Sequence, residues 1–481
     1  MAHGKSRVAV DIGGTFTDIC VLDETNGELR IGKTSSTPRD PIQGAFEALE
    51  TVGVELKDVS LFSHGTTVAT NALITRNLPR SAMVCTEGYR DVVEVRRSNK
   101  EDPWDTYKDV APPYIRRRDR LTVSERIGYD GRVLKPLDEE QAREVAHILK
   151  KRDIKAVAVC FFNSFLNPVN ENRMVEILNE EMPGVPVISS SGTLPEIFEH
   201  ERFSTTMVNA ILSPVVGDYV RRMGEKLKEG GYERDLLMLH TGGGVMTARG
   251  TEKFAGRLAG SGIAAGAIAC RHLAIACGYQ NAIGVDMGGT STDISLVHNG
   301  DIRVTKDWHI EFGYPIRFPS IEVLTIGAGG GSLAWIDQAG SLHNGPQSAG
   351  SDPGPACYPN GGAKPTNTDA NVVLGRLGTS LANGRVVLSQ QKAANAIDEV
   401  IGKPLGLGTE DAAQAIVSVA NANMSDAIRL ISISRGYDPR DFVLVAMGGA
   451  GALHSVALAK DLAIPTVLVP PSPGVAAALG C

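Results

Sequence analysis

The feature that most constrains this chain is a short acidic, glycine-rich motif that occurs twice. The copies run Asp11-Ile12-Gly13-Gly14-Thr15-Phe16-Thr17-Asp18-Ile19 and Asp286-Met287-Gly288-Gly289-Thr290-Ser291-Thr292-Asp293-Ile294. Seven of the twelve positions from Asp11 to Leu22 recur from Asp286 to Val297. Apolar residues flank each copy, which predicts a strand, a tight turn and a second strand. Because the polar residues recur in register, we interpret the repeat as two halves of one ligand site.

The residue types in the motif suit a phosphate group held with a hard cation. Glycines let the backbone approach a ligand closely, and successive N–H groups in such a turn bind anions. A carboxylate at the head of each turn would repel phosphate unless a cation lay between them, and Mg²⁺ commonly pairs one or two carboxylates with substrate phosphates. The alternative is an ordinary turn, since one glycine-rich motif alone is weak evidence. We therefore predict phosphate binding by these loops and Mg²⁺ binding by two carboxylates: Gly13, Gly14, Thr15, Thr17, Gly288, Gly289 and Thr290 for phosphate, and Asp11 and Asp286 for the metal.

Composition excludes several classes of protein. A length of 481 residues predicts two to four domains, and 53 glycines suit an α/β nucleotide-binding protein. The net charge of −7 gives no electrostatic case for nucleic acid. The longest uncharged apolar stretch, residues 258–270, is too short to span a bilayer, so we expect no membrane segment. Seven scattered cysteines without a C-x-x-C pair, and an N-terminus without an apolar core, predict a cytoplasmic protein.

Three further positions could belong to a site. His64 follows an apolar run and begins a turn, either as a hydrogen-bonded turn residue or as a donor at the edge of a cleft. Asp369 lies at a helix entry, where a cap and a site residue are equally good interpretations. Gly448, Gly449 and Gly451 follow a strand at 442–447 and would let a flat adenine or ribose lie against the backbone, and we expect a helix from Ala452 to Lys460 after them.

Two stretches raise questions of organisation rather than chemistry. Residues 87–130 are polar and basic, which is typical of a solvated face, with a surface for a partner as the second interpretation. Residues 196–228 have a helical pattern that we expect to break at Pro214. A domain boundary is plausible near Ser190 to Gly192.

Together these motifs resemble the hydantoinase A/5-oxoprolinase family, within the actin, Hsp70 and sugar-kinase superfamily. Four strings carry the resemblance, and it covers essentially the whole chain: Asp11 to Asp18, His64 to Ala72, Asp286 to Asp293 and Gly448 to His454. It implies an α/β fold with two ribonuclease H-like lobes around an ATP cleft, with inserted segments. It also implies an N-terminal family domain over residues 7–190 and a hydantoinase A domain over 200–481.

The resemblance further implies an activity. Such enzymes use ATP and Mg²⁺ to phosphorylate the carbonyl oxygen of a cyclic amide, which water then opens, often with a separate B-type subunit. By position, Asp11 and Asp286 match the Mg²⁺-side carboxylates, and Gly448, Gly449 and Gly451 match the adenosine side. No general base is identifiable, and Asp18, Asp293 and His64 are the candidates.

Two other functions stay open at this point. Related chains serve ATP-dependent ketone carboxylases of the acetone and acetophenone type, and an ATP-gated scaffold without turnover is a third hypothesis. Family chains usually continue beyond the segment at 470–474, so we also expect that the sequence is a fragment or that the remainder is a separate chain.

Overall fold

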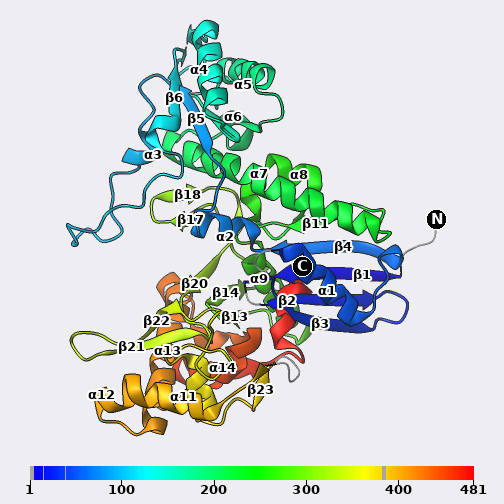
Figure 1. Cartoon of the computed structure of the whole chain (residues 1–481), viewed down its shortest axis with the longest axis vertical. Coiled ribbons are helices and arrows are strands. Elements are labelled where there is room, and N and C mark those ends of the chain that lie inside the picture. The colour runs from blue at the N-terminus through cyan, green and yellow to red at the C-terminus, as the bar shows by residue number, and fades with distance from the viewer. Residues whose placement is uncertain (1–4, 15, 38–39, 382–385) are drawn as a thin grey trace. The chain divides into compact units, whose positions relative to one another are not determined.

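The computed structural model describes residues 5–14, 16–37, 40–381 and 386–481 (Figure 1). It divides into two compact units, each discontinuous in sequence. Unit 1 comprises the chain up to Gly65, Gly262–Arg303 and Ile321–Cys481, and unit 2 comprises Thr66–Ser261 and Val304–Ser320. Helices and strands alternate in both, which confirms the predicted α/β class. These two compact units differ from the predicted family domains over residues 7–190 and 200–481. The boundaries of the family domains stay a prediction.

The first sheet of unit 1 is built around the first motif copy. Strands β4, β1, β2 and β3 lie side by side in that order. The β1–β2 pair is antiparallel, with Asp11 opposite Asp18, and β3 pairs antiparallel with β2, with Lys33 opposite Asp18. The bounds of these strands are Ser6–Ile12 (β1), Phe16–Asp23 (β2), Leu29–Ser35 (β3) and Val59–Thr66 (β4).

The second sheet of unit 1 repeats this arrangement around the second copy. Its order is β15-β14-β13-β25-β26, and β20 also pairs with β14. Asp286 lies opposite Asp293 across the antiparallel β13–β14 pair, and Thr325 of β20 lies opposite Asp293. The bounds are Ala282–Met287 (β13), Thr292–His298 (β14), Asp301–Ile302 (β15), Val323–Ile326 (β20), Val443–Met447 (β25) and Thr466–Leu468 (β26).

Helices cover both faces of the second sheet because its strands are apolar on both sides. Ile283, Val285 and Leu444 pack with residues of α13 and α14, while Ala282 and Val443 pack with residues of α9. These buried clusters fix where the second motif turns out of the sheet. The helices of unit 1 are Pro41–Val52 (α1), Ser261–Ala276 (α9), Asn367–Val373 (α10), Gln390–Ile397 (α11), Lys403–Leu405 (α12), Thr409–Ile431 (α13), Gly448–Asp461 (α14) and Ala476–Gly480 (α15).

Unit 2 holds a four-stranded parallel sheet in the order β10-β9-β5-β6. Its two central strands, β5 and β9, are buried along their whole length, as expected for a parallel sheet covered on both faces. The bounds are Ser81–Thr86 (β5), Arg120–Val123 (β6), Ala156–Cys160 (β9) and Val187–Ser189 (β10). Figure 1 shows α4 and α5 on one side of this sheet and α7 on the other. The main helices are Val92–Val95 (α3), Glu139–Lys151 (α4), Val169–Glu181 (α5), Ser190–Thr193 (α6) and Glu199–Glu229 (α7).

The helix predicted to break at Pro214 is continuous, so that prediction was wrong. α7 runs through Pro214, and its side chains are almost all buried from Phe203 to Ser213. A proline inside a helix costs about 3 kcal/mol. The apolar burial along this helix outweighs that cost, because one fully buried large side chain already contributes roughly 1.5 to 3 kcal/mol.

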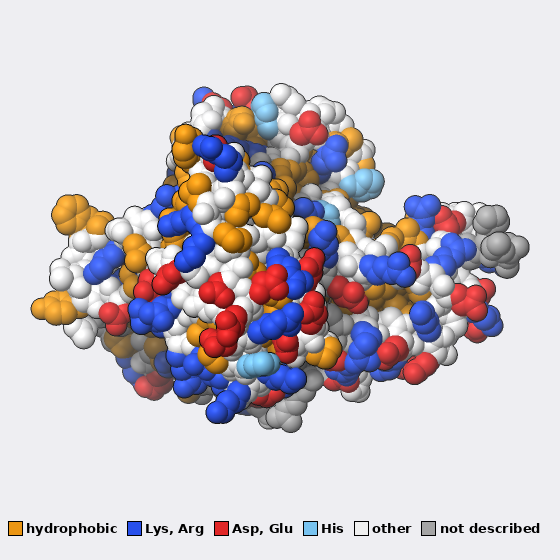
Figure 2. All heavy atoms as spheres, turned by 90° about the horizontal axis from the view of Figure 1, so that it is seen from above, with side chains coloured by type: hydrophobic (Ala, Val, Ile, Leu, Met, Phe, Trp, Pro, Cys, Tyr) orange, Lys and Arg blue, Asp and Glu red, His pale blue; other side chains and the backbone are white. Residues whose placement is uncertain are grey.

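Shorter elements complete the chain. They are β7 (Arg126–Ile127), β8 (Val133–Lys135), β11 (Leu236–Leu239), β12 (Val245–Thr247), β16 (Val304–Thr305), β17 (Trp308–Glu311), β18 (Tyr314–Ile316), β19 (Ser320–Ile321), β21 (Ser332–Ile336), β22 (Leu342–Ser348), β23 (Ser380–Leu381), β24 (Val386–Val387), α2 (Val68–Ile74) and α8 (Ala248–Lys253). None of the helices in the described ranges is long and apolar enough to cross a membrane. Figure 2 shows acidic and basic side chains interleaved over the face that it draws.

Candidate active site

The two motif copies fold into the same hairpin. The Gly13 N–H donates to the Phe16 carbonyl at 3.0 Å, and the Gly288 N–H donates to the Ser291 carbonyl at 3.0 Å. In each sheet the second strand of the hairpin also pairs with a third strand, β3 in the first sheet and β20 in the second. Three residues therefore lie side by side across each sheet, and we call each set a row. The first row is Asp11, Asp18 and Lys33, and the second row is Asp286, Asp293 and Thr325. Both rows belong to unit 1.

The four aspartates of the two rows carry perturbed pKa values. Burial raises the pKa of Asp11 to about 7, and the nearby charge of Asp18 adds to the rise. Burial likewise raises the pKa of Asp286 to about 7, helped by the charges of Asp293 and Asp11, and that of Asp293 to about 6. Burial also raises the pKa of Asp18, against the opposing effect of Lys33. Because Asp11 contributes to the shift at Asp286, the two predicted metal ligands lie within electrostatic reach of each other.

Asp11 has an oxygen that nothing in the described protein satisfies. Its side chain is 7% exposed, and its buried Oδ1 has no hydrogen-bond partner among the described residues. Leaving a buried carboxylate oxygen unpaired is costly, and like charges directly opposite on paired strands add to the cost. A proton or a cation at this oxygen would remove both penalties.

Four glycines bring the backbone against the two carboxylates in matching ways. A Cβ at Gly65, near the end of β4, would lie 2.8 Å from Asp11 Oδ1, and a Cβ at Gly448, directly after β25, would lie 2.6 Å from Asp286 Oδ1. The other two glycines are four residues apart on α9. A Cβ at Gly262 would lie 3.3 Å from Asp11 Oδ1, and one at Gly266 would lie 3.0 Å from Asp286 Oδ2. Residues four apart share a helix face, so α9 approaches both carboxylates with one face.

The turns between the strands are open, as a phosphate loop requires. Gly14, Gly288, Gly289 and Thr290 are exposed, and a Cβ at Gly14 would meet nothing within 4 Å. Thr15 lies outside the described residues. Thr17 instead is buried and lies 3.2 Å from the Ser36 hydroxyl. Its hydroxyl therefore serves the packing of β2, and its role in phosphate binding stays a prediction.

A further glycine segment supports the second turn. The Gly330 N–H donates to the Gly288 carbonyl at 3.0 Å, and the Gly331 N–H donates to the Gly289 carbonyl at 2.7 Å. A Cβ at Gly329 would lie 2.6 Å from the Ser291 nitrogen, so only glycine fits there. Hydrogen bonds to their carbonyls thus hold Gly288 and Gly289 in place.

The C-terminal glycines begin a helix earlier than the predicted start at Ala452. α14 begins at Gly448, which has a φ of +76° and lies against Asp286, as described above. A Cβ at Gly449 would meet nothing within 4 Å, whereas one at Gly451 would lie 3.0 Å from the Val285 carbonyl. Free N–H groups at a helix N-terminus favour anions. Gly448 and Gly451 pack closely against the second sheet, and adenosine binding at Gly448, Gly449 and Gly451 stays a prediction.

The contacts of His64 and Asp369, which each had two interpretations, favour structural roles. The His64 side chain is fully buried, its Nδ1 lies 3.0 Å from the Val10 carbonyl, and burial lowers its pKa to about 4. His64 lies within β4 and not in a turn, so this geometry favours a hydrogen-bonded structural residue, and a catalytic role for His64 stays a prediction. Asp369 forms a capping box with Thr366 and accepts from the Ala356 and Cys357 N–H groups as well. Its carboxylate therefore joins the start of α10 to the loop at Ala356 and Cys357.

Lys33 is a site residue that the sequence analysis missed. Its Nζ lies 2.5 Å from Asp18 Oδ1 and 2.9 Å from the Gly474 carbonyl, and 4.7 Å from the centre of the Phe16 ring. The signal that could have found it is the register of a third strand after the hairpin. That register places a lysine directly opposite Asp18.

Mg²⁺ fits these residues. Among the described residues, no group of three or more His, Cys, Asp or Glu side chains could hold a metal ion on its own. Mg²⁺ does not need such a group, because it keeps several waters and binds one or two carboxylates together with phosphates. The unpaired Asp11 Oδ1, with Asp286 nearby and open glycine turns beside both, meets that requirement.

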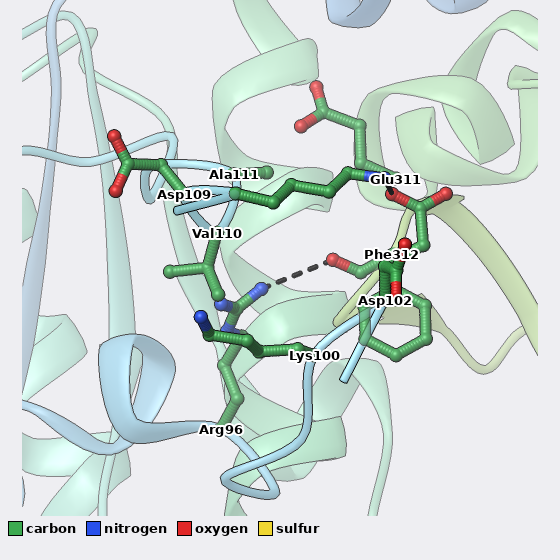
Figure 3. Close-up of a pocket in the computed structure, with 10 residues that line it drawn as sticks. Arg96, Lys100, Asp102, Asp109, Val110, Ala111, Glu311 and Phe312 are labelled. Atoms are coloured by element: carbon green, nitrogen blue, oxygen red, sulfur yellow. Dashed lines mark hydrogen bonds and ion pairs between the residues drawn. The ribbon is translucent and has the colours of Figure 1, made fainter. Parts of the chain in front are cut away.

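A separate cavity lies within unit 2 (Figure 3). It has a volume of about 280 Å³, and its lining mixes both signs of charge. The Arg96 guanidinium donates to the Phe312 carbonyl at 3.2 Å across it. None of the residues predicted for nucleotide binding lines this cavity, whose walls are Arg96, Lys100, Glu101, Asp102, Lys108, Asp109, Val110, Ala111, Glu311 and Phe312.

Comparison with known proteins places this geometry in a family. Residues 202–481 match the hydantoinase/oxoprolinase family, and residues 7–182 match the hydantoinase/oxoprolinase N-terminal region. The chain is 38% identical to caprolactamase subunit alpha of Pseudomonas jessenii, over 98% of this chain and 69% of that protein. It is 36% identical to the acetophenone carboxylase gamma subunit of Aromatoleum aromaticum, over 99% of this chain and 67% of that protein.

Solved structures agree with the sequence matches. The crystal structure of the ATP-dependent caprolactamase from Pseudomonas jessenii has a TM-score of 0.87 at 38% identity, covering 98% of this chain and 70% of that one. Nucleotide-free acetone carboxylase has a TM-score of 0.86 at 27% identity, covering 99% and 70%. The two rows of acidic residues therefore lie in a chain that belongs to the hydantoinase/oxoprolinase family.

Proposed function

We propose that this chain is the ATP-using subunit of an enzyme that opens a cyclic amide by hydrolysis. The observation that carries the proposal is the buried, unpaired Oδ1 of Asp11, beside Asp286 and two open glycine turns. The family match and the 38% identity to caprolactamase subunit alpha support the choice of a lactam or imide as substrate.

In the proposed reaction the amide oxygen attacks the γ-phosphorus of ATP, and the bond from that phosphorus to the β-phosphate oxygen breaks. The product is ADP and an O-phosphorylated amide, whose carbon is a better electrophile than that of the free lactam. Water then adds to this carbon and the ring C–N bond breaks, with a proton passing to the nitrogen, which gives an amine and an acyl phosphate. A second water hydrolyses the acyl phosphate to a carboxylate and inorganic phosphate. Phosphorylation supplies the driving force that an unstrained lactam lacks.

The chain's own groups have separate tasks in this scheme. Asp11 and Asp286 hold Mg²⁺, which neutralises phosphate charge and so favours attack on the γ-phosphorus. The N–H groups of Gly14 and Gly289, in the open turns, bind the phosphates, while those of Gly13 and Gly288 close the hairpins. Positioning and charge neutralisation are the main requirements of phosphoryl transfer, and these residues supply both.

A partner subunit completes the proposal. The relatives named above are called subunit alpha and gamma subunit, so they work in assemblies. Each candidate base for water in this chain is already engaged or buried: Asp18 pairs with Lys33, Asp293 accepts from the Thr325 hydroxyl, and His64 is buried with a lowered pKa. We infer that a hydantoinase B-type subunit contributes to the hydrolytic step.

The direct test is coupled turnover. The full chain is incubated with its B-type subunit, ATP, Mg²⁺ and one of 5-oxoproline, hydantoin or caprolactam, and ADP and ring-opened product are measured together. We expect one ADP for each ring opened with at least one substrate. If no cyclic amide raises ADP release above the rate without substrate, the hydrolase proposal fails.

A ketone carboxylase subunit is the second candidate, supported by the acetophenone carboxylase relative and by the acetone carboxylase structure. The acidic rows would serve equally well there, because ATP would activate an enolate or bicarbonate oxygen. Incorporation of labelled bicarbonate into acetone or acetophenone, with ADP released and no ring opening, would select this function instead.

A further inference from the structure

Three polar side chains of unit 2 lie next to one another and keep hydrogen-bonding groups without partners. β11 leads into His240, Thr241 and three glycines before β12 begins, and a 3-10 helix over Ala255–Leu258 carries Arg257. The Thr241 N–H donates to the Arg257 carbonyl at 2.8 Å, which places these two residues side by side. All of them belong to unit 2, and we call His240, Thr241 and Arg257 the Arg257 cluster.

The guanidinium of Arg257 is held by aromatic rings rather than by an acid. Its Cζ lies 5.1 Å from the centre of the Phe254 ring and 5.2 Å from the centre of the Phe318 ring. In the part of the chain that the structure describes, no acidic side chain forms an ion pair with Arg257, and its buried Nε has no hydrogen-bond partner. Stacking on rings orients a guanidinium and leaves its N–H groups available for an anion.

The Thr241 hydroxyl next to it is buried and also unpaired. Thr241 is 5% exposed, and its Oγ1 has no hydrogen-bond partner among the described residues. The methyl group of the same side chain is closely packed, since a Cβ at Gly260 would lie 3.5 Å from Thr241 Cγ2. A buried hydroxyl without a partner is uncommon and destabilising. An oxygen of a bound ligand would satisfy it.

His240 supplies a third donor, because the turn determines which ring nitrogen carries the proton. Nδ1 accepts from the Gly242 N–H at 3.0 Å, so the neutral ring carries its proton on Nε2. Burial and the charge of Arg257 lower the pKa of His240, which keeps the ring neutral at pH 7. A Cβ at Gly244 would lie 2.9 Å from Nε2, so only glycine fits beside this edge of the ring.

The glycine turn itself is not a phosphate site. The Gly242 N–H is taken by the His240 ring, and the Gly243 N–H donates to the His240 carbonyl at 2.9 Å. Phosphate sites in such turns depend on successive free N–H groups, which this turn does not offer. The donors that remain are a guanidinium, a hydroxyl and an imidazole. A guanidinium matches the geometry of a carboxylate, which can accept two parallel N–H···O bonds from it.

The charge around the cluster is positive. Residues 240–260 contain one acidic residue, Glu252, against three basic residues, which are Arg249, Lys253 and Arg257. Arg249, Glu252 and Lys253 are exposed, so solvent and salt screen them, whereas Arg257 is only partly exposed. A partly buried cation with unpaired donors beside it is complementary to a small anion.

We propose that the Arg257 cluster binds the carboxylate of a small organic acid, and that the cyclic amide opened by this chain carries that carboxylate. The inference rests on the proposed function, which supplies the cyclic amide. It separates lactams that bear a carboxylate, such as 5-oxoproline, from lactams that lack one, such as caprolactam. A site built to pair with a charged group rejects analogues without it, because its own polar groups would stay unpaired. Bicarbonate is the other source of the same chemistry.

The test measures binding to the full chain by calorimetry, without nucleotide and without a partner subunit. The ligands are 5-oxoproline, 2-pyrrolidinone, which is the same ring without the carboxylate, and bicarbonate. We expect 5-oxoproline to bind at least about 30-fold more tightly than either of the others. Arg257→Gln weakens 5-oxoproline binding by at least about 30-fold, whereas the exposed control Arg249→Gln stays within about twofold.

Thr241→Val distinguishes binding from packing. Valine keeps the shape of threonine and removes only the hydroxyl, so 5-oxoproline binding weakens roughly 5 to 10-fold. The unfolding free energy of the ligand-free protein stays equal or rises, because no hydrogen bond within the described chain is lost. Lower stability with unchanged binding would assign Thr241 to packing and contradict its place in the site. This variant also keeps the test decisive if Arg257→Gln does not fold.

The outcomes separate this inference from the proposed function. If the wild type does not bind 5-oxoproline, or binds it no more tightly than 2-pyrrolidinone, the inference is overturned, while coupled turnover with caprolactam still reports on the function. Bicarbonate binding that depends on Arg257, without 5-oxoproline binding, also overturns it, since the carboxylate then does not come from the substrate. If no cyclic amide raises ADP release, the proposed function fails, whatever the calorimetry shows.

Discussion

The two motif copies have nearly the same backbone but different charge. In the first row Asp18 is paired with Lys33 at 2.5 Å, whereas in the second row the equivalent position holds Thr325, whose hydroxyl donates to Asp293 at 2.6 Å. With its acids ionised, the first row carries one net negative charge and the second carries two. The repeated motif thus determines the hairpin, while the residue on the third strand determines how much charge remains for a cation.

The carboxylates also differ in access. Asp11 is buried with an unpaired oxygen, whereas Asp286 is partly exposed. If both hold one Mg²⁺, the deeper carboxylate fixes the ion and the more open one faces the solvent side of the site. The predictions below test whether the rows act together and where they differ.

The largest expected effect is loss of ATP-dependent turnover in Asp11→Asn and in Asp286→Asn. An amide keeps the shape of the carboxylate but loses the charge that holds a cation at the phosphates, so kcat should fall by at least about 10³-fold in each variant. Asp301→Asn is the control, because the Asp301 side chain is 88% exposed and lies outside both rows. Near-wild-type turnover in only one of the two variants would show that the rows do not act together.

The second prediction concerns pH in metal-free protein. The pKa of Asp11 is about 7 in the folded state and about 4 in the unfolded chain, so its contribution to stability is complete below about pH 4 and is lost as pH rises to about 7. The loss amounts to about 1.4 kcal/mol per pH unit at most. Relative to wild type, Asp11→Asn should therefore gain stability between pH 4 and pH 7, measured by urea unfolding in EDTA.

A difference in unfolding free energy that stays flat across this range would mean that Asp11 is not held in a desolvated site. Asp301→Asn is again the reference variant, because its side chain is 88% exposed and lies outside both rows.

The third prediction compares how much Lys33 and Thr325, the third members of the two rows, contribute to stability. Lys33→Met leaves Asp18 without its cation and should lower the unfolding free energy by roughly 2 to 3 kcal/mol at pH 8, less than for a fully buried pair because the Lys33 side chain is 32% exposed. Thr325→Val removes only a neutral donor and should cost roughly 1 kcal/mol. Equal losses in the two variants would contradict the different electrostatics proposed for the rows.

The smallest predicted effects come from the glycines that bring α9 close to the carboxylates. Gly266→Ala and Gly262→Ala each put a methyl group against an aspartate, at 3.0 and 3.3 Å, so turnover should fall roughly 10 to 100-fold, more for Gly266. Gly217→Ala, in helix α7 with nothing within 4 Å, should leave turnover unchanged and stability equal or higher. Loss of stability without loss of turnover would assign these glycines to packing alone.

The sequence predicted the parts of the site that are local. Strand, turn and strand follow from apolar runs that flank Gly-Gly, and both hairpins fold as expected, with Asp11 and Asp286 at equivalent positions. The cap interpretation of Asp369 is likewise confirmed by its capping box. Each of these depends on residues close together in the chain.

The remaining parts depend on tertiary register. Lys33 joins the first row only because the register between β2 and β3 places it opposite Asp18. Gly262 and Gly266 lie near the two carboxylates only because α9 packs against both Asp11 and Asp286. The continuous helix through Pro214 was mispredicted for the same reason, since burial outweighed a local preference. Gly448 begins α14 four residues early because a glycine can adopt the φ of +76° required beside Asp286.

The most direct test of the central claim is the binding of Mn²⁺, as a spectroscopic substitute for Mg²⁺, in the presence of ADP. Electron paramagnetic resonance titration counts the ions bound by the wild type, Asp11→Asn and Asp286→Asn. We expect one Mn²⁺ per chain in the wild type, and binding weakened at least about tenfold in both variants. Wild-type Mn²⁺ affinity in either variant would contradict a single metal site shared by the two aspartates.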